Sequence, residues 1–146
     1  MKLANLSFPL MVILRTIQGL FALLVLILSA IVANWYNTST NYLPPSQISF
    51  LLFAAVWSIL SIFCIETYIA ASLDLTNTLF YLAGFAALAA FLNSLLFCRG
   101  DVCRAAQADV AFGAFSFATW AASAALTCTE VVRARRAGGG SSPSAA

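Results

Sequence analysis

The sequence contains no histidine and has few charged residues. Lys, Arg, Asp and Glu together make up 8% of its 146 residues, whereas a soluble domain has about 25%. A soluble fold of this length needs more charged surface than these side chains supply. The absence of histidine excludes histidine-ligated metal sites and histidine-based catalysis.

Two further motifs are absent. No basic stretch with interleaved aromatic residues occurs, so we expect no nucleic-acid partner. None of the four cysteines has the C-x-x-C spacing of redox and zinc motifs. We therefore expect no metal and no cofactor.

Apolar residues are abundant, at 62% of the chain. A transmembrane helix needs about 20 predominantly apolar residues. Four segments meet this need: residues 14–34, 48–70, 76–97 and 106–131. We therefore predict an all-α membrane protein, a four-transmembrane antiparallel helix bundle. Reading the first segment as a cleaved signal peptide is an alternative, although its length and Arg15 argue against it.

Polar segments separate the predicted spans. Residues 35–47 and 98–105 form two loops on one side of the membrane, and residues 71–75 form a short turn on the other. Residues 1–13 form an interfacial N-terminal segment, and residues 132–146 form a basic and then disordered tail. Near the spans, the side with both termini carries five cations and the opposite loops carry two. The positive-inside rule therefore predicts that both termini are cytoplasmic.

Glu66 is an acidic residue well inside an apolar run. A carboxylate at this depth is costly unless it is paired, and it often marks an ion or substrate pathway. Arg15 lies at the matching depth of the first span, so we predict an Arg15–Glu66 pair near the cytoplasmic face. A proton or substrate site at Glu66 is the alternative. Gln18 is expected to form a hydrogen bond to another helix, because an amide at bilayer depth needs a partner.

Two cysteines and one asparagine lie in the outer loops. Cys98 and Cys103 face a compartment expected to be oxidising, and the glycine between them lets their Cα atoms approach to disulfide distance. We predict a structural disulfide between them. Asn37 begins an N-x-S/T sequon and is a candidate for N-glycosylation. Cys128 precedes the final arginines and is a candidate for palmitoylation, whereas Cys64 is interpreted as a packing residue.

Small residues recur at helical spacing in the last two spans. Ala114, Ala118 and Ala122 form a row in the fourth span, and Ala86 and Ala90 form another in the third. Such rows let helix backbones approach closely in lipid. Packing within the bundle is the simpler interpretation of this helix-packing face, and contact with a second copy or a partner helix is the alternative.

Residues 103–112, where Cys103 and Arg104 lead into an Ala- and Phe-rich helix, resemble the start of the fourth span in fungal MARVEL-domain proteins of the non-classical export family. The occurrence of an Arg followed shortly by a Gln at the start of the first span, here Arg15 and Gln18, is also similar. With the tetraspan topology, the resemblance covers residues 6–136. It implies a non-enzymatic protein of the plasma membrane or secretory pathway that organises membrane domains, acts in vesicle traffic or serves as an accessory subunit. Membrane lipids, other integral membrane proteins or a second copy would be its partners.

A small membrane enzyme or transporter is the alternative class. Four-helix glutathione-transferase-like and thiol-redox enzymes are of similar size, but the sequence lacks a charged cofactor cluster and C-x-x-C spacing. A small multidrug-type transporter would carry its essential carboxylate in the first span, and residues 14–34 contain none. We therefore predict a non-enzymatic protein.

Overall fold

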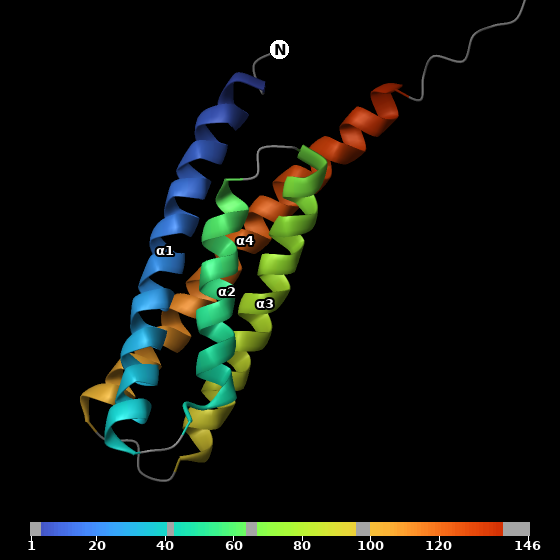
Figure 1. The fold of residues 1–146 in the computed structure, drawn as a ribbon. Helices are drawn as coiled ribbons and strands as arrows, with labels where there is room; N and C mark the ends of the chain where they lie inside the picture. Colours follow the sequence, from blue (N-terminus) through green and yellow to red (C-terminus); the bar gives the residue numbers. More distant parts are fainter. Residues whose placement is uncertain (1–3, 41–42, 64–66, 96–99, 139–146) are drawn as a thin grey trace, which may run out of the picture.

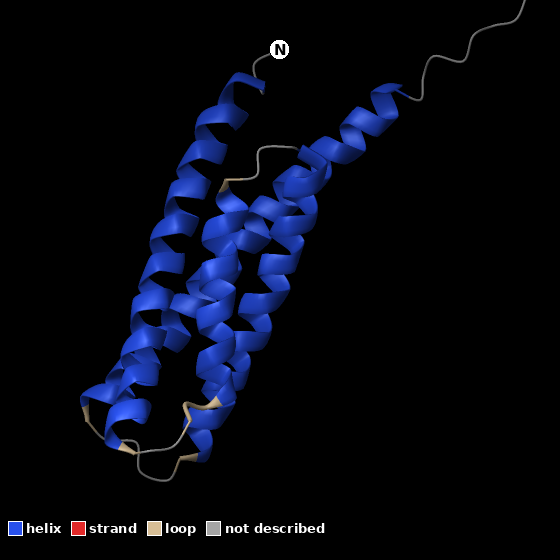
Figure 2. Ribbon diagram, in the orientation of Figure 1, coloured by secondary structure: helices blue, strands red, loops and turns tan. Residues whose placement is uncertain are grey.

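The computed structural model describes residues 4–40, 43–63, 67–95 and 100–138. All regular secondary structure in these ranges is helical (Figure 2). The helices are α1 (Ala4–Ser39), α2 (Ser46–Ile62), α3 (Thr67–Ser94) and α4 (Asp101–Gly138). The predicted all-α class is therefore confirmed.

The helices form a closed ring. Each helix packs against its neighbours in the chain, and α4 also packs against α1. Successive helices run in opposite directions (Figure 1). The first turns of α1 and the last turns of α4 lie at the same end of the bundle, which we call the terminal end (Figure 1). The end of α1 and the start of α4 lie at the opposite end, which we call the loop end.

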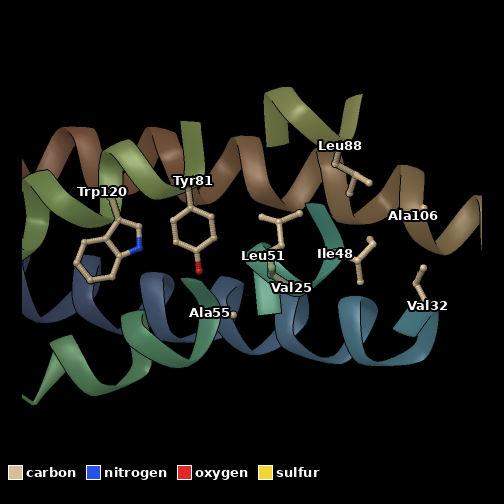
Figure 3. Close-up of a cluster of buried hydrophobic side chains, with 9 residues drawn as sticks. All are labelled: Val25, Val32, Ile48, Leu51, Ala55, Tyr81, Leu88, Ala106 and Trp120. Carbon is tan, nitrogen blue, oxygen red and sulfur yellow. The ribbon is translucent and has the colours of Figure 1, made fainter. Parts of the chain in front are cut away.

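A cluster of nine buried side chains fills the centre of the bundle, with contributions from all four helices (Figure 3). Its members are Val25, Val32, Ile48, Leu51, Ala55, Tyr81, Leu88, Ala106 and Trp120. Along α1 and α3 they recur every seven residues, the interval that keeps side chains on one helix face. The outer surface is also apolar: Leu20, Leu60 and Phe115 are each more than half exposed. A surface of this kind suits contact with lipid rather than with water.

Three of the helices are long and apolar enough to cross a membrane, over Pro9–Ser39, Ile69–Ser94 and Asp101–Ala137. The fourth, α2, has 17 residues. That length is at the lower limit for a membrane-crossing helix, about 17–25 residues.

The helix ends differ most from the predicted spans between α2 and α3. The span predicted over 48–70 does not match one helix, since α2 ends at Ile62 and α3 begins at Thr67. The turn predicted at 71–75 is therefore helical. The polarity of this stretch suggests a turn, but Asp74 and Asn77 are fully buried in the bundle, where hydrogen bonds to other helices replace water.

The other helices are longer than predicted. α1 continues to Ser39, into the predicted loop 35–47, and α4 begins at Asp101, inside the predicted loop 98–105. α4 also extends through the three arginines to Gly138. Because a helix satisfies its backbone groups internally, it can continue through the membrane interface. The final residues of the predicted tail, 139–146, lie outside the described residues.

Candidate functional site: a buried polar network

Arg15 on α1 forms an ion pair with Asp74 on α3. Arg15 Nη1 lies 2.7 Å from Asp74 Oδ1, and the two side chains are 20% and 0% exposed. The guanidinium also lies over the ring of Trp120, 5.5 Å from its centroid. The charge of the buried carboxylate is thus balanced by a cation that a large aromatic ring shields from lipid.

The second oxygen of Asp74 accepts hydrogen bonds from α4. Ser123 Oγ donates to Asp74 Oδ2 at 2.7 Å, and Thr127 Oγ1 is 3.3 Å away. Asp74 therefore links α1, α3 and α4 at one level of the bundle.

A second interhelical bond connects α1 to α4. Gln18 Nε2 on α1 donates to the Thr119 carbonyl at 3.2 Å, which confirms the predicted interhelical bond.

A separate hydrogen bond connects α2 to α3. Ser58 Oγ donates to Asn77 Oδ1 at 2.7 Å, and both side chains are fully buried. Asn77 Nδ2 donates to the Leu73 carbonyl at 2.9 Å. The amide of Asn77 thus has a partner for both its oxygen and its nitrogen.

Asp109 on α4 has a different environment from Asp74. Ser29 Oγ on α1 lies 2.6 Å from Asp109 Oδ2, but Asp109 Oδ1 is buried and has no hydrogen-bond partner among the described residues. The Tyr81 hydroxyl on α3 and Ser116 Oγ on α4 are also buried without a hydrogen-bond partner among the described residues. Asp109 therefore lies in the bundle without the cation that balances Asp74.

Two of the predicted site residues, Glu66 and Cys98, lie outside the described residues. The Arg15–Glu66 pair and the Cys98–Cys103 disulfide therefore remain predictions, and the acidic partner that the described structure gives Arg15 is Asp74. Cys103 is 8% exposed in the first turn of α4, at the loop end.

The two predicted modification sites are exposed. Asn37 lies near the end of α1, at the loop end of the bundle. Cys128 is a free cysteine on α4, toward the terminal end. The modifications themselves remain predictions.

The predicted packing face on α4 points mainly outward. Ala114 is half-buried, but Ala118 and Ala122 are exposed. Ala86 and Ala90 on α3 are exposed as well. The role of this helix-packing face stays a prediction.

A cavity of about 590 Å³ opens at the loop end. Residues from all four helices line it, among them Trp35, Tyr36, Ile48, Leu88 and Asp101. Within the described part of the chain, no group of three or more His, Cys, Asp or Glu side chains is arranged to hold a metal ion.

The sequence contains a signal for the buried polar residues of α4 that apolar runs alone do not reveal. On α4, Asp109, Ser116, Ser123 and Thr127 are separated by seven, seven and four residues. Such spacing places them on one helix face, which in a membrane helix faces the bundle. The partners of Asp109, Ser123 and Thr127 on other helices have no such signal, because they depend on how the helices pack.

The apolar outer surface, the long apolar helices and the inward-facing polar groups together define an integral membrane protein with a helical bundle fold. The family model for MARVEL, described as a membrane-associating domain, matches residues 8–126. The chain belongs to the MARVEL family, as the sequence resemblance predicts. No curated protein and no solved structure matches the chain.

Proposed function

We propose that this chain is a non-enzymatic tetraspan protein that organises membrane domains through lateral contacts, in vesicle traffic or as an accessory subunit of a larger membrane complex. The observation that carries the proposal is the outward exposure of Ala118 and Ala122 on α4. In lipid, small residues on an exposed helix face allow close backbone approach by a second helix. A second copy of the chain or another integral membrane protein would supply that helix.

The interior of the bundle supports a structural role. Asp74 is satisfied by Arg15, Ser123 and Thr127, and Asn77 is satisfied by Ser58 and its own helix. These polar groups hold the helices together, which leaves them poorly placed to act on a substrate. We therefore favour an organising role, without a cofactor, over the enzyme and transporter alternatives.

We further propose four spans with both termini in the cytoplasm, at the plasma membrane or a secretory-pathway membrane. Arg133, Arg135 and Arg136 are exposed at the terminal end. On the cytoplasmic side they would attract anionic lipids by about 1 kcal/mol per cation. Asn37 and Cys103 lie at the loop end, which this topology places in the oxidising compartment.

The topology is tested by glycosylation of Asn37. Expression in a eukaryotic host should give a glycosidase-sensitive mass shift that Asn37→Gln removes. A host-independent check is labelling of an added cysteine at either end with a membrane-impermeant thiol reagent. Labelling at the C-terminal end of intact cells would contradict the proposed orientation.

The lateral contact is tested by energy transfer between donor- and acceptor-labelled copies in liposomes. Ala118→Leu with Ala122→Leu should reduce self-association, because two larger side chains hold the helices apart. Ala30→Leu is the matched control, since Ala30 is an exposed alanine on α1.

Equal energy transfer in the wild type, the α4 variant and the control would rule out self-association through this face. In that case, affinity purification in mild detergent with the same variants decides whether another membrane protein uses it. Co-purification unaffected by the α4 substitutions would overturn the lateral-contact proposal.

A further inference from the structure

The cavity at the loop end has an apolar floor. Val32, Ile48, Leu88 and Ala106 line it and are themselves almost fully buried. In Figure 3 these four side chains lie together at one end of the core cluster. The volume of about 590 Å³ lies within the range of small-molecule sites, about 300–1,000 Å³. Such a floor suits a hydrocarbon chain rather than a polar solute.

The described lining of the cavity contains one charged side chain. Asp101 is the one charged side chain among the described residues that line it, and it is exposed at the start of α4. It forms no ion pair within the described part of the chain. An anionic headgroup would be repelled by this carboxylate, whereas an ammonium group would be attracted.

Two aromatic rings lie at the same cavity. The rings of Trp35 and Tyr36 are 5.2 Å apart between centroids and meet edge-on at 89°. Aromatic faces attract quaternary and primary ammonium groups. Trp and Tyr also concentrate at the depth of lipid headgroups, so an occupant with its polar end here would place its apolar end in the cavity floor.

We propose that this cavity binds one phospholipid with an ammonium headgroup, phosphatidylcholine or phosphatidylethanolamine. An acyl chain contacts the floor at Ile48, Leu88 and Ala106, and the ammonium lies by Asp101 and the aromatic pair. The inference deepens the lipid contacts of the proposed function and rests on the chain spanning a bilayer. A helix of a second copy is too large for the cavity, since an α-helix with side chains is about 10–12 Å wide.

The test is native mass spectrometry of the full chain in mild detergent. The protein is offered equal amounts of phosphatidylcholine, phosphatidylethanolamine, phosphatidylglycerol and phosphatidic acid with identical acyl chains. We expect one ammonium-bearing lipid to be retained per chain, at least about fivefold above phosphatidic acid, as a partly desolvated cation–π contact allows. Equal retention of all four lipids, or none, would overturn the proposal.

Variants separate the headgroup contact from the apolar floor. Asp101→Asn should abolish the preference for ammonium lipids, whereas Glu130→Gln, which removes one negative charge near the other end of α4, should not. Leu95→Trp places a larger side chain at the cavity wall and should lower retention of every lipid. Leu75→Trp, at an exposed position near the start of α3 and away from the cavity, is the matched control.

A preference that survives Asp101→Asn, or a loss of lipid in Leu75→Trp equal to that in Leu95→Trp, would refute this site. The result is independent of the energy-transfer experiment. Lipid retained by a monomeric protein would support the cavity while overturning self-association, and an assembly without bound lipid would do the reverse.

Discussion

Arg15 reaches across the ring of helices to pair with Asp74 at 2.7 Å. The two residues lie on α1 and α3, which are not adjacent in the ring. Asp74 also accepts a hydrogen bond from Ser123 on α4. One carboxylate thus connects three helices, and the relative placement of α1, α3 and α4 depends on it.

Asp74→Asn should destabilise the fold by about 3 kcal/mol, because it leaves the cation of Arg15 largely buried without its partner. The free energy of unfolding is measured by titrating the purified protein with SDS. Asp101→Asn, a change at an exposed carboxylate, should cost about 0.5 kcal/mol or less.

Replacing both partners tests the interpretation. Arg15→Met combined with Asp74→Leu should recover much of the loss, since an apolar pair leaves no unbalanced charge. If the loss in the double variant equals the sum of the losses in Arg15→Met and Asp74→Leu measured singly, the ion pair is not the cause.

The bond between Ser58 and Asn77 should contribute less than the ion pair. A double-mutant cycle of Ser58→Ala and Asn77→Ala should give a coupling of about 0.6–1.7 kcal/mol, the range for hydrogen bonds between membrane helices. Ser61 provides the control, because it is buried on the same helix but bonds only to the Trp57 carbonyl. Coupling of Asn77 to Ser61 as strong as to Ser58 would contradict the assignment.

The sequence predicts the helical class and the presence of long apolar helices, because long apolar runs are a local property. It also predicts that Gln18 needs a partner. It does not predict that the partner is the Thr119 carbonyl, because that contact joins residues far apart in the chain. The choice of helix partner depends on packing, which leaves no pattern along a single segment.

The polar residues near the start of α3 led to the wrong prediction of a turn at residues 71–75. Asp74 and Asn77 resemble turn residues when only their neighbours are considered. In the bundle, each is buried against another helix, so their polarity reflects interhelical bonding. Glu66 is conspicuous in the sequence as an acidic residue within an apolar run, but it lies outside the described residues.

Gly113 should tolerate no larger side chain. A Cβ atom at this position would lie 3.0 Å from Phe85 Cβ on α3, an atom fixed to the backbone. Gly113→Ala should therefore destabilise the bundle by about 1–3 kcal/mol through overpacking. Gly19→Ala is the control: its Cβ would meet only the tip of Ile62 at 3.5 Å, and it should stabilise α1 by about 0.5–1 kcal/mol. Equal effects of the two substitutions would show that helix propensity, not close packing, dominates.

The predicted disulfide is tested by counting thiols. Denatured, unreduced protein should show two reactive thiols out of the four cysteines in the chain, those of Cys64 and Cys128. Cys98→Ser should raise the count by one, because it releases Cys103. Four reactive thiols in the wild type would refute the bridge.

Asp109 should respond to substitution differently from Asp74, although both are fully buried aspartates. Asp109 Oδ1 has no hydrogen-bond partner among the described residues, and the bond that is present comes from the neutral Ser29. Asparagine keeps an acceptor for Ser29 and removes the cost of placing an unbalanced charge in the bundle. Asp109→Asn should therefore leave the free energy of unfolding unchanged or raise it by about 1 kcal/mol, in the same SDS titration that shows a large loss for Asp74→Asn. A loss as large as that of Asp74→Asn would mean that the Asp109 carboxylate is balanced by a cation, and would point to residues outside the described ranges as its source.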